Sequence, residues 1–429
     1  MDVMQQLVKD IVSHSDALSK TLEEDGSSAS LSTLMMHTEG PGYPRESADH
    51  RMKLIDALDE LRTMVLGPTS YIFYTAMLAP SWSATFSMLY RYKIAFHVPQ
   101  NESISYSDLA TLCGLSEQET TRILRAAISL RVFEEQPTGL VKHNANSLAL
   151  TSPLAHDAVG FATEEYAPAA LRYADSLARF PKSDKASESP CAIANGSVGD
   201  RDIFSLIAND SSRVSRVANA MGWVLTVPET SLHLFLDQVP WSRPNGGRPC
   251  PKVVVDVGGS HGGLAEALLR RFPGIEHVVV EDLPEVTKMN REKGPPTDIA
   301  GRITYHDYDF FTEQDVKDAD IYIFRTVIHD WPDSYAIKIL QNQLRALRPG
   351  ATILINDTCI DATNWKASII TQAQSANDIM VKMALNARER TKEDWETLVQ
   401  AVDPGLTIRS ITSIASSVLA VIEVVRSQA

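Results

Sequence analysis

Short apolar runs of β type alternate with helical segments throughout the second half of the chain. The runs are rich in valine and isoleucine and lie at 253–257, 277–281, 303–308, 321–325 and 352–355. Strands joined through helices pair in parallel, because each helix carries the chain back along the sheet. Only a short loop separates the runs at 406–411 and 418–425, which indicates an antiparallel hairpin. The pattern predicts an α/β domain at 241–429 with an open parallel sheet that ends in this hairpin.

Composition and charge exclude several classes of protein. Of 429 residues, 44% are hydrophobic and 22% are charged, as in ordinary folded domains. A formal net charge of −14 argues against nucleic acid as a partner, because phosphate binding needs a basic surface. The four cysteines lack the short spacings of a zinc ribbon or a disulfide framework. No apolar run is long enough to cross a membrane, and Asp2 stands where a signal peptide is basic, so we expect a cytoplasmic protein.

The first half of the chain is mainly helical in pattern and divides into three predicted segments. Residues 1–50 contain an amphipathic helix at 3–22, followed by a Ser-, Gly- and Pro-rich stretch that is typical of a mobile linker. Residues 51–153 contain aromatic-rich helices, interrupted at Gly67-Pro68, and a compact module described below. Residues 154–240 form a helical connector that we expect to contribute to a substrate pocket, with a polar surface loop at 183–200.

Residues 103–150 have the pattern of a winged helix. Ser105 and Ser116 are each followed three residues later by an acidic residue, as in capping boxes, and Gly114 supplies the turn between two short helices. Two β-type runs around a Pro-Thr-Gly turn predict the wing. Many winged helices bind DNA, but residues 101–150 carry six acidic and four basic side chains. The charge therefore favours a scaffold over a DNA-binding module.

A glycine-rich turn follows the first strand of the α/β domain, in the sequence Lys252-Val-Val-Val-Asp-Val-Gly-Gly-Ser-His-Gly-Gly263. Open α/β sheets bind ligands beyond the carboxyl ends of their strands, and glycine lets the backbone approach a ligand closely. Asp282 ends the next strand and follows Gly262 by 20 residues, the offset at which a carboxylate reaches ribose hydroxyls. The alternative is that Asp282 only caps the turn at Leu283.

The spacing of these glycines narrows the choice of nucleotide. The dinucleotide pattern GxGxxG fails because Ser260 follows Gly258 by two positions and His261 follows Gly259, and no phosphate-binding P-loop is present. An adenosine-bearing ligand without a pyrophosphate remains, and S-adenosylmethionine is one. His261 is expected to be a turn residue that faces solvent.

Six short motifs lie in the second half of the chain. They are Asp256-Val-Gly-Gly-Ser-His-Gly262, Glu281-Asp-Leu-Pro284, Tyr308-Asp-Phe-Phe311, Arg325-Thr-Val-Ile-His-Asp-Trp-Pro-Asp333, Ile355-Asn-Asp357 and Asn386-Ala-Arg-Glu-Arg-Thr391. From Trp82 to the C-terminus the chain resembles the class I S-adenosylmethionine-dependent O-methyltransferases of the plant caffeic-acid type. It is most similar to their fungal secondary-metabolite relatives, such as the sterigmatocystin and aflatoxin O-methyltransferases. Ser260 replaces a glycine that is common in the plant members, a change that is tolerable if its side chain points into solvent.

The resemblance implies both a fold and a cofactor site. The fold is a Rossmann-like class I methyltransferase sheet behind a mostly helical winged-helix domain that mediates dimerisation, so we expect an obligate homodimer. S-adenosylmethionine, which leaves as S-adenosylhomocysteine, is the implied cofactor, and no metal is implied. By family position, the cofactor-binding residues are Gly258, Gly259, Asp282, Leu283, Asp309, Phe310 and Arg325. In this set Asp309 and Phe310 take the adenine and Arg325 takes the polar end, although Arg325 has an alternative as an ordinary salt-bridge residue.

The resemblance also implies a catalytic group. His329 directly follows the fourth strand and is implied as the general base, with Asp357 and Glu389 flanking it. An imidazole pKa of about 6.5 suits proton removal near neutral pH. The alternative is a capping or core histidine. The implied acceptor-pocket residues are Met221, Trp223, Met380, Met383 and Asn386, although methionines at helical spacing also pack cores.

The expected function is methyl transfer to a hydroxyl group, expected to be phenolic, of an aromatic fungal metabolite such as a polyketide. A relative that keeps the fold but runs a pericyclic, cyclisation or dehydration step is the alternative. The presence of His329, Asp357 and Glu389 favours methyl transfer. A transcriptional regulator is disfavoured by the acidic balance of the winged helix.

Overall fold

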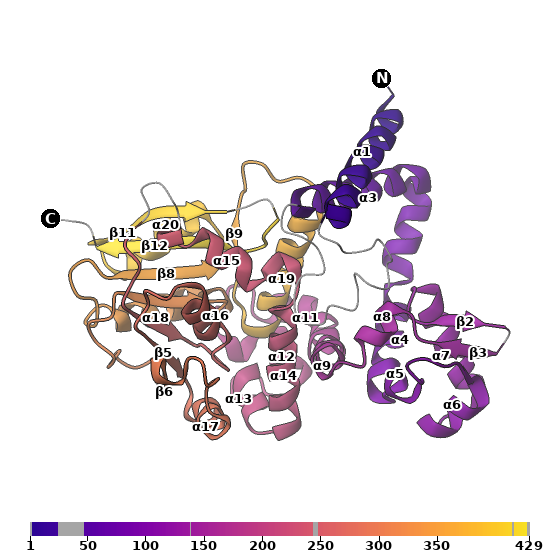
Figure 1. Cartoon of the computed structure of the whole chain (residues 1–429). Helices are drawn as coiled ribbons and strands as arrows, with labels where there is room; N and C mark the ends of the chain where they lie inside the picture. Colours follow the sequence, from indigo (N-terminus) through magenta and orange to yellow (C-terminus); the bar gives the residue numbers. More distant parts are fainter. Residues whose placement is uncertain (1, 25–46, 138, 243–247, 414–415, 427–429) are drawn as a thin grey trace. The chain divides into compact units, whose positions relative to one another are not determined.

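The computed structural model describes residues 2–24, 47–137, 139–242, 248–413 and 416–426 (Figure 1). Nearly all of the predicted linker, and part of the seam between the two halves, lie outside the described residues. The chain forms two compact units, Met1–Arg172 with Phe204–Pro228, and Tyr173–Ile203 with Glu229–Ala429. No helix among the described residues has the length and apolarity needed to span a bilayer.

Among its described residues, the first unit begins with five helical segments. They are α1 (Val3–Glu24), α3 (Ala48–Ile72), the π-helix η2 (Phe73–Met77), α4 (Ala79–Arg91) and α5 (Ile94–His97). The longest of them are α1 and α3. Helix α1 packs against α3. The predicted interruption is a kink inside α3, where Gly67 has a φ of 65° and Pro68 begins the next helical turn. Proline is suited to that first position because its missing N–H has no helical partner there.

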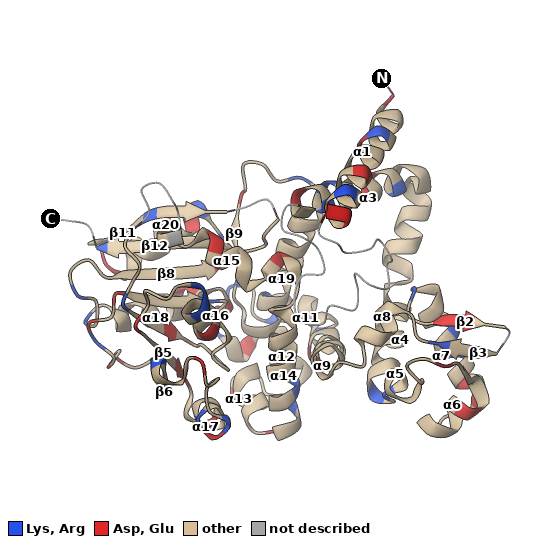
Figure 2. Ribbon diagram, viewed as in Figure 1, with Lys and Arg blue, Asp and Glu red and all other residues tan. Residues whose placement is uncertain are grey.

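The winged helix is present as predicted. It consists of β1 (Ile104–Ser105), α6 (Tyr106–Cys113), α7 (Glu117–Ser129), β2 (Glu134–Gln136) and β3 (Leu140–Lys142), with the strand order β1-β3-β2. The Ser105 and Ser116 hydroxyls accept hydrogen bonds from backbone N–H groups three residues later, at 3.1 and 3.2 Å. Gly114 ends α6 with a φ of 68°. Acidic and basic residues are interspersed over these elements (Figure 2).

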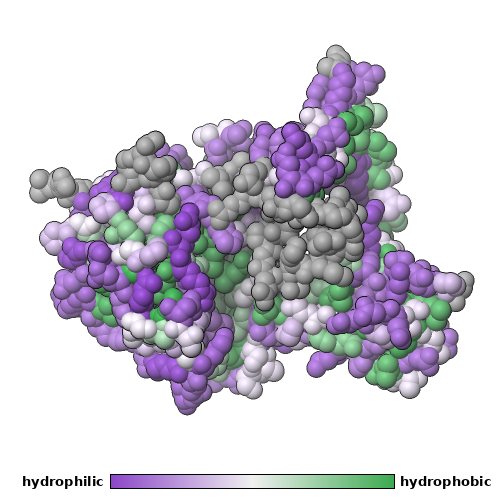
Figure 3. Space-filling view, viewed as in Figure 1, coloured by the Kyte–Doolittle hydropathy of each residue, from purple (hydrophilic) through white to green (hydrophobic). Residues whose placement is uncertain are grey.

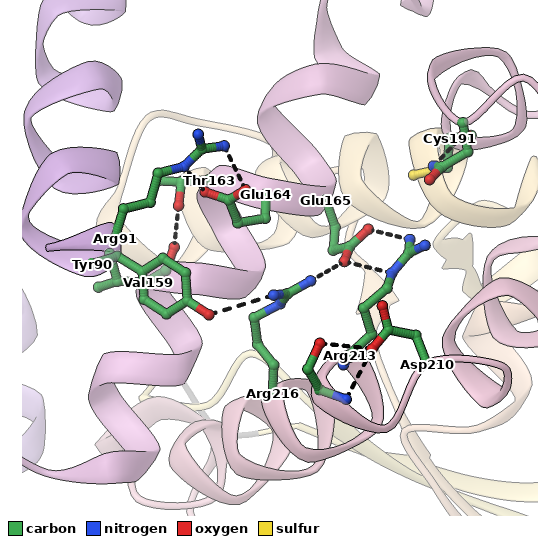
Figure 4. Close-up of polar contacts among 12 residues, drawn as sticks. Tyr90, Arg91, Val159, Thr163, Glu164, Glu165, Cys191, Asp210, Arg213 and Arg216 are labelled. Carbon is green, nitrogen blue, oxygen red and sulfur yellow. Dashed lines mark hydrogen bonds and ion pairs between the residues drawn. The ribbon is translucent and has the colours of Figure 1, made fainter. Parts of the chain in front are cut away.

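The remaining helices of the first unit are α8 (Ala145–Ala149), α9 (Pro153–Phe161), the π-helix η3 (Ala162–Tyr166), α10 (Ala167–Ala170), α13 (Ile203–Ala208) and α14 (Ser211–Val224). A buried ionic cluster joins two of them, η3 and α14, to α4 (Figure 4). Glu165 is only 4% exposed and accepts hydrogen bonds from Arg213, at 2.6 and 3.0 Å, and from Arg216, at 2.6 Å. Arg216 also reaches the Tyr90 hydroxyl, at 3.4 Å. The Glu165 carboxylate thereby ties η3 to α14, and Arg216 ties α14 to α4.

Near the start of the second unit lies a segment whose structure differs from the prediction. Residues 183–200 were expected to form a surface loop, but they contain the 3₁₀ helix η4 (Ala186–Glu188) and helix α12 (Pro190–Ala194). The Ser189 hydroxyl caps α12 by accepting a hydrogen bond from the Ala192 N–H at 3.2 Å, and Cys191 and Ala192 are buried. The prediction was wrong because the polar flanks masked a short apolar helix, which packs against α19 (Ile369–Leu385). Helix α11 (Tyr173–Arg179) precedes it.

The core of the second unit is a seven-stranded sheet with the order β11-β12-β8-β7-β4-β5-β6. Its strands are β4 (Val253–Val257), β5 (His277–Asp282), β6 (Ile303–Asp307), β7 (Ile321–Arg325), β8 (Thr352–Asp357), β11 (Leu406–Thr412) and β12 (Ala420–Arg426). Strands β6, β5, β4, β7 and β8 pair in parallel, whereas β12 is antiparallel to both β8 and β11. The predicted α/β sheet and its C-terminal hairpin are confirmed.

Helices cover both faces of this sheet. Helices α18 (Asp333–Gln343) and α20 (Lys392–Val402) share one apolar core with the sheet, while α15 (Leu232–Gln238) and α16 (Gly263–Arg271) share the other. The strands read as continuous apolar runs for this reason, since both of their faces are buried. Helix α17 (Pro284–Lys293) follows β5.

Candidate active site

The glycine turn after β4 has a backbone that other residues would distort. Gly258 and Gly262 have φ values of 73° and 80°. A Cβ on Gly259 would lie 2.6 Å from a carboxylate oxygen of buried Asp256. The N–H groups of Gly258 and Gly259 donate to the Glu281 carbonyl oxygen, at 2.9 and 3.0 Å, which fixes the turn against β5. Ser260 and His261 are exposed, as expected for both residues.

Asp282 lies at the end of β5 beside this turn. Its carboxylate accepts hydrogen bonds from the Ser260 N–H at 2.9 Å and from the Leu283 N–H at 2.8 Å. Burial raises the pKa of Asp282, although both hydrogen bonds oppose that shift. The residue therefore caps the Leu283 turn, as the alternative interpretation has it, and also braces the glycine turn. Its contact with the ribose stays a prediction.

Asp309 and Phe310 follow the neighbouring strand β6. Asp309 is exposed and accepts a hydrogen bond from the Phe311 N–H at 2.9 Å. Phe310 is half-buried and packs edge-on against Phe311 and Trp331. The structure thus brings the glycine turn, the Asp282 carboxylate and an aromatic ring to the carboxyl ends of three adjacent parallel strands. A carboxylate for ribose hydroxyls and an apolar ring for adenine, beside a turn that a ligand can approach closely, fit the chemistry of S-adenosylmethionine.

Arg325 ends β7 and is engaged inside the protein. Its guanidinium donates to the Asn356 side-chain oxygen and to the Thr230 carbonyl oxygen. Burial lowers the pKa of Arg325 to about 10, against the opposing effect of Asp256 and Asp357. Both contacts are hydrogen bonds to neutral oxygens and neither is the salt bridge of the alternative interpretation. The contact of Arg325 with the polar end of the cofactor stays a prediction.

His329 lies in the 3₁₀ turn η8 (Ile328–Asp330), directly after β7. Its Nδ1 is 2.8 Å from a carboxylate oxygen of Glu389, and its backbone N–H donates to Asp357 at 3.0 Å. Its Nε2 is 3.7 Å from a carboxylate oxygen of Asp330. The structure therefore brings together the histidine and the two carboxylates that the sequence analysis grouped, and it adds a third carboxylate.

Burial and the neighbouring carboxylates shift the pKa of His329 in opposite directions. Burial alone lowers the pKa of His329, but Glu389, Asp330 and Asp357 together outweigh it and raise that pKa to about 10. Burial raises the pKa of Asp330 to about 6 and also raises that of Asp357. The pKa of Glu389 is lowered, because the charge and hydrogen bond of His329 overcome its burial. Both shifts favour the charged forms of His329 and Glu389, which lie 2.8 Å apart.

Helix α19 supplies two residues that position Glu389 and that sequence reasoning missed. The Asn377 side-chain N–H group donates to the Glu389 carboxylate, and its nitrogen lies 3.4 Å from Nδ1 of His329. The neighbouring Asp378 accepts a hydrogen bond from the Glu389 N–H at 2.7 Å. No short motif links these positions, so only the fold brings them together.

The expected acceptor residues fall into two groups. Met380 and Met383 lie on α19, and Asn386 ends it with a φ of 59° while its amide donates to the Lys185 carbonyl oxygen at 2.8 Å. Met221 and Trp223 lie on α14 of the other unit, where they are 43% and 40% exposed. A pocket role for these residues stays a prediction.

Known proteins identify the family to which this chain belongs. A model of the O-methyltransferase domain matches residues 250–403. O-methyltransferase pgmB of Aspergillus terreus is 31% identical over 390 residues, which make up 89% of this chain and 86% of that protein. The chain belongs to the S-adenosylmethionine-dependent O-methyltransferases. The grayanic acid biosynthesis cluster O-methyltransferase of Cladonia grayi is 31% identical over 384 residues, covering 88% of this chain and 78% of that protein.

Solved structures share the fold of this O-methyltransferase. One titled as a pericyclic reaction enzyme has a TM-score of 0.76 and 21% identity, and covers 98% of this chain and 100% of its own. OxaC in complex with S-adenosylhomocysteine and oxaline has a TM-score of 0.76 and 21% identity, and covers 99% of both chains. The family resemblance, the fold and the cofactor predicted from the sequence are confirmed.

Proposed function

We propose that this O-methyltransferase methylates a phenolic hydroxyl group of a fungal aromatic metabolite, with His329 as the general base. The observation that carries the proposal is the contact of His329 with Glu389, at 2.8 Å, at the carboxyl end of β7. A biosynthetic-cluster methyltransferase among the relatives supports a natural product as the substrate.

The proposal gives each ring nitrogen of His329 its own task. Nδ1 is held by Glu389, so Nε2 of the neutral ring is the nitrogen that accepts a proton from the substrate hydroxyl. The neighbouring carboxylates favour the imidazolium, which must therefore lose a proton before the ring can act as a base. Bound S-adenosylmethionine supplies an electrophilic methyl group on a positively charged sulfur. Glu389 holds the ring through Nδ1 and Asp357 holds the backbone N–H of His329, while both charges stabilise the imidazolium, as the aspartate of a catalytic triad does. The chain's own contribution is therefore proton removal and alignment of the acceptor oxygen.

The test uses S-adenosylmethionine with a labelled methyl group and a panel of phenolic aromatic compounds. We expect label on a phenolic oxygen of at least one compound, with one S-adenosylhomocysteine formed per label. A product that is an isomer of its substrate, formed without consumption of the cofactor, would instead support a pericyclic enzyme. The structural similarity to the pericyclic reaction enzyme does not favour that alternative. The two sequences are 21% identical, so the similarity concerns the fold alone.

Asp282 is proposed to bind the ribose, and its replacement should weaken cofactor binding. Hydrogen bonds to a charged group contribute about 1.5–3 kcal/mol each, so we expect Asp282→Asn to raise the Kd for S-adenosylhomocysteine by about 10-fold or more. Isothermal titration calorimetry measures this Kd. Glu292→Gln, an exposed change on α17, is the control and should leave the Kd unchanged. Equal affinity of Asp282→Asn and wild type would remove Asp282 from the ribose site.

We also propose that a second copy of the chain covers the apolar face of α3 and η2. Large apolar side chains are exposed there, including Val65 at 68% and Met77 at 67%. The full set is Leu58, Met64, Val65, Ile72, Phe73, Tyr74 and Met77. Figure 3 shows hydrophobic surface over α3. Exposed patches of this kind mark protein interfaces, and a homodimer fits a helical N-terminal domain of this family.

The oligomeric state tests this surface. Light scattering after gel filtration should give the mass of a dimer for the wild type and of a monomer for the double variant Val65→Glu, Met77→Glu. Leu171→Glu is the matched control, because Leu171 is 82% exposed in the same unit but lies outside this face. A wild-type monomer, or a double variant that still dimerises, would contradict the proposal.

A further inference from the structure

We propose that Glu281, His306 and Asp315 form a binding site for a divalent transition-metal cation. One carboxylate oxygen from each acid and one ring nitrogen of His306 all lie within 4.8 Å of one another. The three residues come from the end of β5, from β6 and from the segment that follows β6. They form no short metal-binding motif in the sequence, so only the fold brings them together.

The state of Glu281 is the second observation that points to a cation. Its side chain is fully buried, and one oxygen accepts a hydrogen bond from the Gln314 amide at 2.8 Å. The other oxygen, Oε1, is buried without a hydrogen-bond partner among the described residues. A buried carboxylate that is only half satisfied is costly, and a bound cation offsets that cost.

The sheet holds the first two ligands in register. Glu281 and His306 are direct partners across the parallel β5–β6 ladder, so their side chains project from the same face. Asp315 already contacts His306, with the Nε2 nitrogen 2.9 Å from a carboxylate oxygen. His306 and Asp315 are 35% and 63% exposed at their side chains, so the site is open to ions from solvent.

A second layer of side chains orients the buried ligand. The Gln314 amide donates both to Glu281 and, at 3.2 Å, to the side-chain oxygen of Gln343 on α18. Metal-binding carboxylates commonly have such hydrogen-bonded support. The arrangement therefore has the ligands, the access and the supporting contacts of a metal site.

The donor set indicates which cation fits. One imidazole nitrogen and two carboxylate oxygens suit Zn²⁺ and its neighbours in the first transition row better than Mg²⁺ or Ca²⁺, which prefer oxygen ligands alone. A bound ion would fasten residues 307–314 at both ends. That segment carries Asp309 and Phe310, so the ion would steady the proposed adenine contacts, while Asp282 projects from the opposite face of β5. The proposed role of the ion is structural and separate from proton removal by His329.

Titration of the full-length, chelator-treated protein tests the site. Calorimetry with Zn²⁺, and the visible absorption of Co²⁺, should show one site that binds at micromolar or lower concentration. His306→Gln should weaken this binding by about 10-fold or more, and Zn²⁺ should raise the unfolding temperature of the wild type but not of this variant. His277→Gln is the matched control, because His277 lies on β5 and its Nε2 contacts Thr304 instead.

Glu281→Gln provides a second variant, since it keeps the shape of the buried side chain and replaces the carboxylate ligand with an amide. We expect it to lose the site while His277→Gln keeps it. Two results would contradict the proposal: His306→Gln binds Zn²⁺ as tightly as the wild type, or the wild type shows no saturable binding of Zn²⁺. The cluster would then be only a contact between His306 and Asp315. Neither readout depends on methyl transfer, so this proposal and the proposed function fail independently.

Discussion

His329→Ala should lower kcat for methyl transfer by about 100-fold or more, because a positioned general base contributes 10²–10⁴-fold to such reactions. The loss should appear in single-turnover rates, where product release does not intervene. Affinity for S-adenosylhomocysteine, measured by calorimetry, should stay close to wild type, since His329 is not among the proposed cofactor residues, most of which lie at the ends of β4, β5 and β6. If His329→Ala transferred the labelled methyl group as fast as the wild type, His329 would have no part in the mechanism.

The pH dependence gives an independent check on the same residue. Three carboxylates raise the pKa of His329 to about 10, against the opposing effect of burial, so its neutral form grows as pH rises. We therefore expect kcat/KM to increase with pH through a pKa above the ordinary value of about 6.5. Glu389→Gln removes one of the charges that stabilise the imidazolium, so this limb should shift to lower pH. A limb that stays in place would show that another group is titrating.

Arg390→Met should be the most destabilising single change near the site. Arg390 is fully buried, its guanidinium donates to the carbonyl oxygens of Ile328 and Trp331, at 3.2 and 2.8 Å, and it also binds Asp333 at 2.9 Å. Its guanidinium also lies over the Trp395 ring, 5.1 Å from the centroid. Removing one partner of a buried charged network costs about 3–5 kcal/mol, and urea unfolding measures that loss.

Arg388 offers a matched control for this variant. It lies two residues away and also binds Asp333, at 2.9 Å, but its side chain is 49% exposed. Exposed ion pairs contribute about 0–1 kcal/mol, so Arg388→Met should cost little. Because the Ile328 and Trp331 carbonyls flank His329, Arg390→Met should also reduce activity, and equal stability of the two variants would refute this account.

Local patterns were sufficient to predict much of the fold. Each strand of the parallel sheet is a short valine- and isoleucine-rich run, and turns at Gly114 and Gly258 need a positive φ that glycine adopts readily. The same patterns located the ends of β5 and β7, and with them Asp282 and His329. The short helix α12 was missed, because its burial depends on α19, nearly two hundred residues further along the chain.

The amino-acid sequence by itself determined the order of strands and helices, the glycine turn and the family of the protein, since these depend on neighbours in the chain. Only the tertiary structure decided which distant side chains meet. It placed Asn377 against Glu389, and Glu281 beside His306 and Asp315. The first grouping depends on the packing of α19 and the second on the register of β5 and β6, and both arise only once the whole unit has folded.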